Sequence, residues 1–186
     1  MTPRISFIVF VSTWWVLAAA ALVAYLLSGN AAPKRQAGMT ANLLVIAPFL
    51  LVPVLFYVGR YGGVYQGNEV TRAAGGLTAV AGLAGYLLSH LYLRRNWSLA
   101  ASVREGQRLV TSGPYGLVRH PMYSSMTAIV LGSGLMTDNY LIVAATIVVA
   151  MVYYVRARQE EDLLRQEFPE FEQYASKVAM FIPFVF

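Results

Sequence analysis

The sequence predicts an all-α integral membrane protein of about five transmembrane helices, the last two forming a helical hairpin. The 186-residue chain is 58% hydrophobic and 12% charged, whereas soluble domains carry about 25% charged residues. Uncharged runs long enough to cross a bilayer recur along it. Basic residues concentrate on alternate loops between those runs, which is the pattern that sets membrane topology.

The first two apolar runs, 5–27 and 42–59, are expected to span the membrane. Residues 5–27 contain no charged residue, and about 20 apolar residues suffice for a span. The apolar core of a signal peptide has only about 7–15 residues, so we expect this segment to be retained. The second run contains Pro48 and Pro53, which are expected to kink it and which neighbouring helices can accommodate.

The third span, at about 74–93, is expected to pack closely against a neighbouring helix. Small residues let two helix backbones approach each other in lipid. A glycine-rich nucleotide-binding loop is the alternative, but such a loop follows a β-strand, and no strand pattern precedes this segment. Helix packing is therefore the preferred interpretation. The small residues concerned are Gly75, Ala79, Gly82 and Gly85.

Spans four and five, at about 121–136 and 139–155, are expected to form a hairpin because only the short turn at 137–139 joins them. Residues 156–180 are expected to form one or two amphipathic helices. Pro169 should break that helical pattern, because proline lacks the backbone N–H that a helix interior needs.

The basic residues predict how the chain lies in the membrane. The N-terminus and the second and fourth loops together hold three lysines and arginines, whereas the first loop, the polar third loop at 94–120 and the C-terminal tail hold eleven. Because basic loops stay in the cytoplasm, the N-terminus is expected outside and the C-terminus inside. The third loop and the tail should then share the cytoplasmic face.

The residue inventory argues against several functional classes. The chain has no cysteine, which excludes disulfides, thiol nucleophiles and cysteine-ligated metals. Its only histidines are His90 and His120, without an HExxH pair, so no metal centre is expected. The net charge is +5, but the basic residues flank the spans, so no nucleic-acid partner is expected. The oligomeric state is left open.

The tripeptide Arg119-His120-Pro121 is unusually polar for the start of a span. Because spans four and five run antiparallel, it should lie near Arg156 and the glutamate pair at 160–161. In the simplest interpretation these are a helix salt bridge worth about 0.2–0.5 kcal/mol and an interfacial arginine. Proline suits the first helical turn, whose N–H groups attract anions. The corner therefore also suits a ligand with both an anionic and a cationic part.

Two motifs in the C-terminal half are specific. They read LVTSGPYGLVRHPMYSS and, after the hairpin, RARQEEDLLRQEFPEFEQYASKVAMFIP, with NWS upstream at 96–98. Together they strongly resemble the isoprenylcysteine carboxyl methyltransferase family, which belongs with the membrane phospholipid methyltransferases. The resemblance covers about 90–186. We therefore expect one membrane domain, 1–186, in which three N-terminal spans (1–93) precede a methyltransferase-like catalytic half (94–186).

The resemblance implies S-adenosylmethionine as methyl donor, bound between the RHP segment and the glutamate pair. Either Glu160 or Glu161 should accept hydrogen bonds from the donor, and only one, because adjacent helix residues point about 100° apart. The donor carboxylate would be held by Arg119, His120 or the N–H groups after Pro121. The residues expected to pack on adenine are Leu109, Val110, Tyr115 and Tyr123.

The methyl acceptor is expected to be lipophilic and to arrive through the lipid. A carboxylate is ionised at neutral pH and needs no general base, which favours a prenylated cysteine or a similar acid or thiol over an aminophospholipid. Arg119 and Arg156 are the expected catalytic residues, the first as a bidentate carboxylate holder and the second orienting the acceptor. Trp97 is the expected substrate contact. A reductase-like or non-enzymatic membrane protein is the remaining alternative.

Room for the acceptor's tail could come from small residues in the fourth span. Gly132, Ser133 and Gly134 are consecutive there. They either leave space for a lipid tail or allow close helix packing, and packing is the preferred interpretation.

Overall fold

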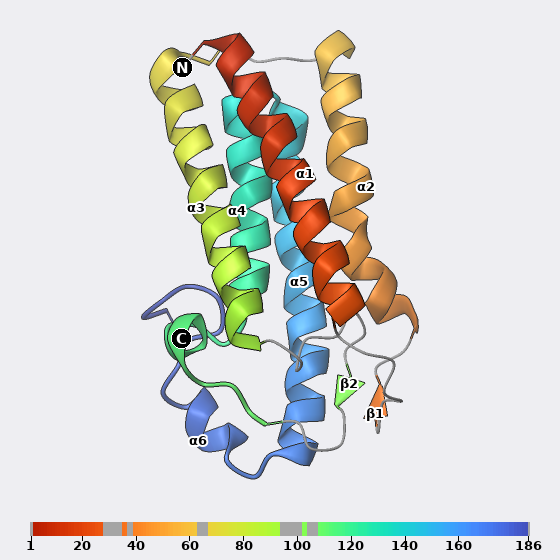
Figure 1. Ribbon diagram of the computed structural model, residues 1–186, viewed down its shortest axis with the longest axis vertical. Helices are drawn as coiled ribbons and strands as arrows, with labels where there is room; N and C mark the ends of the chain where they lie inside the picture. The colour runs from red at the N-terminus through yellow and green to blue at the C-terminus, as the bar shows by residue number, and fades with distance from the viewer. Residues whose placement is uncertain are drawn as a thin grey trace.

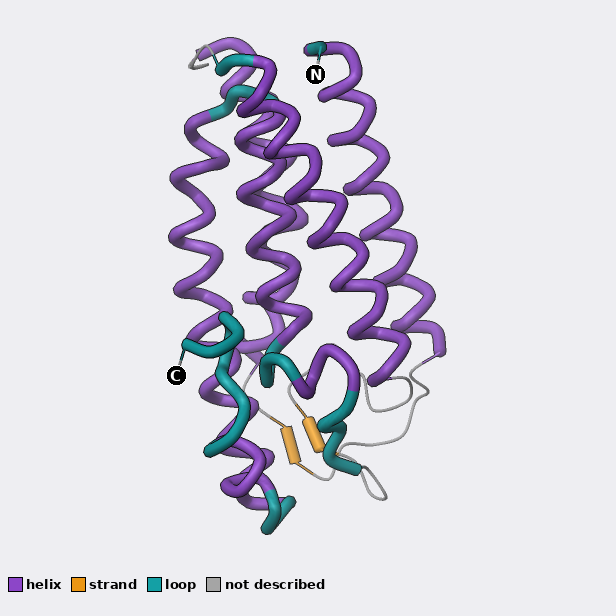
Figure 2. Tube along the Cα trace, turned by 90° about the vertical axis from the view of Figure 1, so that its left-hand side faces the viewer, coloured by secondary structure: helices purple, strands orange, loops and turns teal. Residues whose placement is uncertain are grey.

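Five long helices lie side by side as one bundle, and the short elements gather at one end of it (Figure 1, Figure 2). The bundle helices are α1 (Pro3–Leu27), α2 (Met39–Gly62), α3 (Glu69–Leu93), α4 (Pro121–Met136) and α5 (Tyr140–Glu167). This computed structural model describes residues 2–27, 35–36, 39–62, 67–93, 102–103 and 108–185. The predicted all-α class is confirmed, since the two strands contain only two residues each.

The bundle is apolar on both its inside and its outside. Side chains such as Leu17, Ile129 and Ile142 are fully buried between the helices. Large apolar side chains such as Trp15 and Leu77 are exposed on the outer surface, and contact with lipid satisfies them better than water. The chain is thus an integral membrane protein.

Three of the bundle helices are long and apolar enough to cross a membrane by length and hydropathy alone. These are α1, α3 and α5, while the described part of α2 holds a shorter apolar stretch at Pro48–Gly59. Helix α4 has 16 residues and begins and ends where the fourth span was predicted. Helix α2 continues through both prolines.

Helices α3 and α4 pack with their backbones almost in contact, as the small residues of α3 predicted. A Cβ atom at Gly132 would lie 2.6 Å from the backbone nitrogen of Ala79 and 2.6 Å from the carbonyl oxygen of Gly75. On the neighbouring faces of α4, the Ser133 hydroxyl accepts a 3.1 Å hydrogen bond from the Trp14 indole, and Gly134 packs against Val143. These small residues serve helix packing and leave no room for a lipid tail.

The hairpin differs from the prediction at its C-terminal end. Asn139 caps α5 by accepting hydrogen bonds from the N–H groups of Leu141 and Ile142. The helix then continues without a break to Glu167, so a span ending at residue 155 with a separate amphipathic helix after it was wrong. The expected break at Pro169 is confirmed, because α6 (Phe171–Ala175) starts anew after it. One rigid helix therefore joins the bundle to the glutamate pair.

The described parts of the first loop (35–36), the third loop (102–103 and 108–120) and the tail lie at one end of the bundle (Figure 1). There β1 (Arg35–Gln36) pairs antiparallel with β2 (Ser102–Val103). The 3-10 helix η2 (Gly113–Gly116) precedes α4 at the same end, and Val118 forms an isolated parallel bridge with Ala179. The third loop, where it is described, and the tail thus lie together as expected, while their cytoplasmic location stays a prediction.

Candidate functional site

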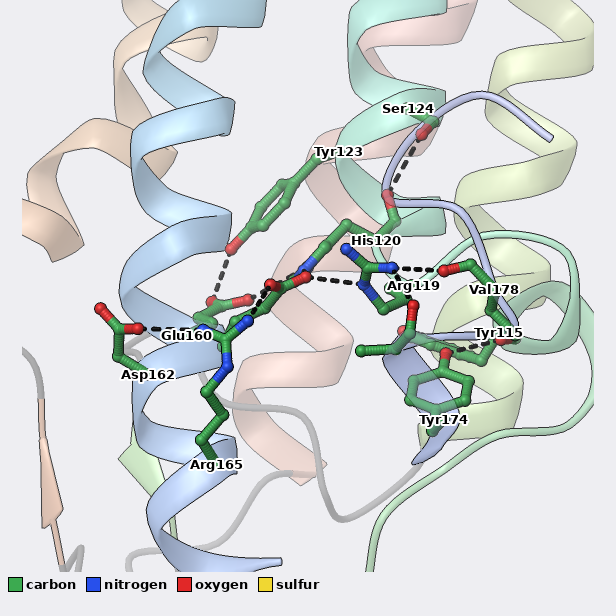
Figure 3. Close-up of polar contacts among 12 residues, drawn as sticks. Tyr115, Arg119, His120, Tyr123, Ser124, Glu160, Asp162, Arg165, Tyr174 and Val178 are labelled. Atoms are coloured by element: carbon green, nitrogen blue, oxygen red, sulfur yellow. Dashed lines mark hydrogen bonds and ion pairs between the residues drawn. The ribbon is translucent and has the colours of Figure 1, made fainter. Parts of the chain in front are cut away.

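Arg119 ties the C-terminal segment to the start of α4 (Figure 3). Its Nη1 donates to the carbonyl oxygens of Ala175, at 2.9 Å, and Val178. Its backbone N–H donates to the Ala179 carbonyl at 2.8 Å. These backbone contacts show that Arg119 positions the C-terminal segment. For Arg119 to bind a ligand carboxylate in a bidentate manner, some of these hydrogen bonds would have to break.

Glu161 is the buried anionic centre of the cluster. Its carboxylate has no exposed surface and accepts from Arg119 Nε at 2.8 Å. His120 Nε2 lies 3.1 Å from the same oxygen, and Arg165 Nη2 donates to the other oxygen at 3.2 Å. Both oxygens are thus already occupied by cationic or polar groups of the protein.

Glu160 is placed differently although it is the next residue. One of its oxygens accepts from the Tyr123 hydroxyl at 2.6 Å and lies 3.2 Å from Arg156 Nε. The other oxygen is 3.7 Å from His120 Nδ1, beyond normal hydrogen-bond length. The side chain is 26% exposed, and this second oxygen, which makes no hydrogen bond of normal length to the described residues, is the candidate for a ligand contact.

Aromatic rings extend the cluster into the bundle. The His120 ring stacks on Tyr123 with centroids 5.8 Å apart, and Tyr123 stacks on Tyr153 at 4.8 Å. Phe181 of the C-terminal segment covers His120 from another side, at 5.8 Å. The Ser124 hydroxyl donates to the Phe181 carbonyl at 2.7 Å and fixes that position.

Pro121 is the first residue of α4, as expected. The N–H groups that follow are less available than the sequence suggested. Those of Tyr123 and Ser124 both donate to the His120 carbonyl within the first turn. An incoming anion would therefore compete with this turn.

The residues expected to pack on adenine fall into two places. Tyr115 is buried, and its carbonyl accepts from the Tyr174 hydroxyl at 2.6 Å. Leu109 instead packs with Phe168 and Phe171 near α6, while Val110 is half-buried. Their role toward a cofactor stays a prediction, and Trp97 lies outside the described residues.

The two tyrosines of this contact remain protonated over the physiological range. Burial raises the pKa of the Tyr174 phenol to about 12. Burial first, and then the nearby Glu160 carboxylate, raises the pKa of Tyr115 well above its usual range. Tyr174 therefore acts as a hydrogen-bond donor that locks α6 to η2.

The predicted meeting of the RHP tripeptide with Arg156 and the glutamate pair is confirmed by these distances. Sequence reasoning missed Arg165, Tyr174 and the C-terminal segment as parts of the cluster. Arg165 was detectable, because it lies four residues after Glu161, a spacing that favours an ion pair on one helix face. The backbone contacts of the segment leave no such pattern in the sequence.

The fold and the site define an integral membrane protein with a mixed-charge cluster at one end of a helical hairpin. The chain matches the family model described as Phospholipid methyltransferase over residues 70–170, more than half its length, and it belongs to that family. The match begins in α3, earlier than the resemblance noted in the sequence.

Two curated relatives are bacterial proteins named for metal resistance. The chain is 33% identical over 140 residues to the cobalt-zinc-cadmium resistance protein CzcN of Cupriavidus metallidurans, covering 75% of this chain and 61% of that protein. It is 37% identical over 91 residues to the nickel-cobalt-cadmium resistance protein NccN of Alcaligenes xylosoxydans xylosoxydans, 48% of this chain and 43% of that one.

A plant relative confirms the resemblance to isoprenylcysteine carboxyl methyltransferases. A probable protein-S-isoprenylcysteine O-methyltransferase of Oryza sativa subsp. japonica is 41% identical over 80 residues, 42% of each chain. The chain thus spans between 42% and 61% of the length of these three relatives.

Proposed function

We propose that this protein is an S-adenosylmethionine-dependent methyltransferase that methylates a lipophilic acid at the membrane surface. The observation that carries the proposal is Glu160, a partly exposed carboxylate held among Tyr123, Arg156 and His120 where the lipid-facing bundle ends. A water-soluble donor and a lipid-borne acceptor can meet only at such a boundary. Membership of the phospholipid methyltransferase family supports the same chemistry.

The residues of the cluster fit the charges of the donor. S-adenosylmethionine carries an ammonium and a sulfonium cation together with one carboxylate. Glu160 has an oxygen open to the cations, whereas Glu161 is saturated by protein groups. We therefore assign the cofactor contact to Glu160 and a structural role to Glu161. Arg119 has Nη2 left for the donor carboxylate, since its Nε and Nη1 bind protein oxygens.

When bound, S-adenosylmethionine would supply a methyl group on a positively charged sulfur, which leaves as a neutral thioether. A lone pair of the acceptor's carboxylate oxygen forms the new C–O bond, and the electron pair of the broken S–CH₃ bond stays on sulfur. No proton moves, so the protein must mainly align the reactants, which can contribute about 7–11 kcal/mol. We assign to Arg156, which is fully buried and also paired with Glu160, the role of orienting the acceptor's anion.

The acceptor class is best tested directly. Purified protein in nanodiscs would be supplied with tritiated S-adenosylmethionine and farnesylated N-acetylcysteine, and base-labile methyl ester would be counted. The matching carboxamide, which cannot form the ester, is the control. Methylation of phosphatidylethanolamine in place of the acid would reject the carboxylate proposal and support phospholipid N-methylation, the activity that the family's name suggests.

Glu160→Gln is expected to weaken S-adenosylmethionine binding about tenfold or more. Glutamine can keep the oxygen that binds Tyr123 and Arg156 and place its amide nitrogen where the open oxygen stood. The ligand then loses a charge-assisted hydrogen bond of about 1.5–3 kcal/mol. Isothermal titration calorimetry measures the change, with the exposed Asp162→Asn as control. Unaltered affinity in a folded Glu160→Gln protein would refute the assignment.

We also propose that the site faces the cytoplasm, because eleven of the fourteen basic residues lie on that side of the predicted topology. Reporter fusions after residue 30 and after residue 185 are both expected to report a cytoplasmic location. A fusion after residue 65 should report the outside. The reverse pattern would mean that the orientation of the protein in the membrane is inverted and that the site faces the outer compartment.

A further inference from the structure

The hydroxyl of Tyr153 is a polar group buried inside the apolar bundle. The side chain is 1% exposed, and its oxygen has no hydrogen-bond partner among the described residues. The ring stacks on Tyr123 with centroids 4.8 Å apart and an interplanar angle of 16°. Phenylalanine would make the same stack without burying an oxygen.

An unpaired buried hydroxyl destabilises a folded protein, because it loses its hydrogen bonds to water and gains none. Buried oxygens of Asp138 and Gln159 also lack a hydrogen-bond partner among the described residues, but other polar side chains of the bundle avoid that cost. The Trp14 indole donates to Ser133, and the Thr146 hydroxyl donates to the Ile142 carbonyl. The unpaired oxygen of Tyr153 belongs to the ring that stacks on Tyr123 of the candidate site, so its partner is expected to come from a ligand of that site.

The position of Tyr153 on α5 indicates which ligand would supply the hydrogen-bond partner of its hydroxyl. Tyr153 precedes Arg156 by three residues and Glu160 by seven on α5, or about 4.5 and 10 Å along the helix axis. Tyr153 belongs to the apolar core of the bundle, whereas Glu160 lies in the polar cluster toward the end of α5 (Figure 3). A molecule entering from the lipid would meet Tyr153 before it reached the glutamate.

The chemistry of the neighbourhood favours an anionic group. A phenol hydroxyl is a hydrogen-bond donor, and the nearest charged residue on the buried face of α5 is the cation Arg156. Arg156 Nε also contacts the Tyr123 hydroxyl at 3.3 Å, which links it to the ring stacked on Tyr153. In a low-dielectric interior these donors stabilise a negative charge more strongly than they would in water.

We propose that the Tyr153 hydroxyl donates a hydrogen bond to the anionic group of the lipophilic methyl acceptor and positions it beside Arg156. This inference rests on the proposed function and names a substrate-binding residue for the same site. This contact would discriminate between acidic and amine groups on the acceptor. A carboxylate oxygen can accept a hydrogen bond from the phenol, whereas a protonated amine has no lone pair with which to accept one.

Tyr153→Phe tests the proposal with two readouts. Removal of an unpaired hydroxyl should raise the melting temperature of the ligand-free protein by about 2–4 °C. The KM for farnesylated N-acetylcysteine should rise on the order of tenfold, as expected for a lost hydrogen bond to a charged group, while S-adenosylmethionine affinity stays within about twofold. Tyr154→Phe is the matched control, because the Tyr154 side chain is mostly exposed.

Binding of the acid, followed as thermal stabilisation without any donor, separates this inference from the proposed activity. The acid should stabilise the wild type and the Tyr154→Phe variant but not Tyr153→Phe. That result supports the Tyr153 contact even if no methyl ester forms. An acid that stabilises wild type and Tyr153→Phe equally, or an unchanged KM, overturns the inference and leaves the methyltransferase proposal standing. An acid that stabilises none of the three overturns it as well.

Discussion

Glu161→Ala is expected to lower the free energy of unfolding by about 3–5 kcal/mol, which is the cost of removing one partner from a buried ion pair. Arg119 and His120 would lose the carboxylate oxygen that both contact, in a place with little access to water. Arg165 is more exposed, so its loss adds little. Thermal or denaturant unfolding in detergent measures the change.

The neighbouring carboxylate provides the control for this prediction. Asp162 is 67% exposed and, among the described residues, pairs with Arg165 alone, at 3.0 Å, so Asp162→Ala should change stability by less than about 0.5 kcal/mol. Equal effects of the two substitutions would mean that Glu161 is not the centre of a buried network. It would then become a candidate for the cofactor contact that we assign to Glu160.

Gly132→Leu is expected to prevent α3 and α4 from packing and to remove most folded protein. Even the Cβ of alanine would lie 2.6 Å from two backbone atoms of α3, and backbone cannot rotate away as a side chain can. Overpacking of this kind costs about 1–3 kcal/mol and sometimes more, against a gain of at most about 1 kcal/mol from replacing a helical glycine. Size-exclusion profiles and melting temperatures after purification report the loss.

Gly85→Ala is the matched control, since it lies on the same interface. The closest atom to its added Cβ is the Ser125 hydroxyl oxygen, at 2.6 Å, the free end of a side chain that can turn aside. This variant should retain a melting temperature close to wild type. If Gly132→Ala were equally harmless, the close approach of the two backbones would not be a requirement of the fold.

The bundle could be predicted from the sequence because lipid imposes simple rules. Length and absence of charge located most helix ends to within a few residues, and the glycines of α3 indicated a close helix contact without identifying the partner helix. The C-terminal end of α5 was not predicted, because the first charged residue after the apolar run was taken to mark the end of the span. Residues such as Arg156 and Glu161 are instead buried by contacts within the protein, so the same helix continues past the apolar run.

The candidate site was only partly predictable for a different reason. The order of the elements was enough to predict that Arg119 and His120 lie near the glutamate pair. The two helices of a hairpin run antiparallel, so the start of the first lies beside the end of the second. The sequence could not separate Glu160 from Glu161, because that difference depends on which carboxylate Arg119 and Arg165 reach. Nor could it identify Tyr153, whose significance lies in a partner that the described part of the chain does not provide.

The tie between Arg119 and the C-terminal segment also has a consequence for biogenesis. Arg119 binds carbonyl groups 56 and 59 residues further along the chain, so the ribosome must pass residue 181 before the start of α4 acquires its neighbours. At about 5–20 residues per second, the start of α4 waits several seconds until these partners have been synthesised. Insertion of the helices and completion of the site are therefore separate events in time.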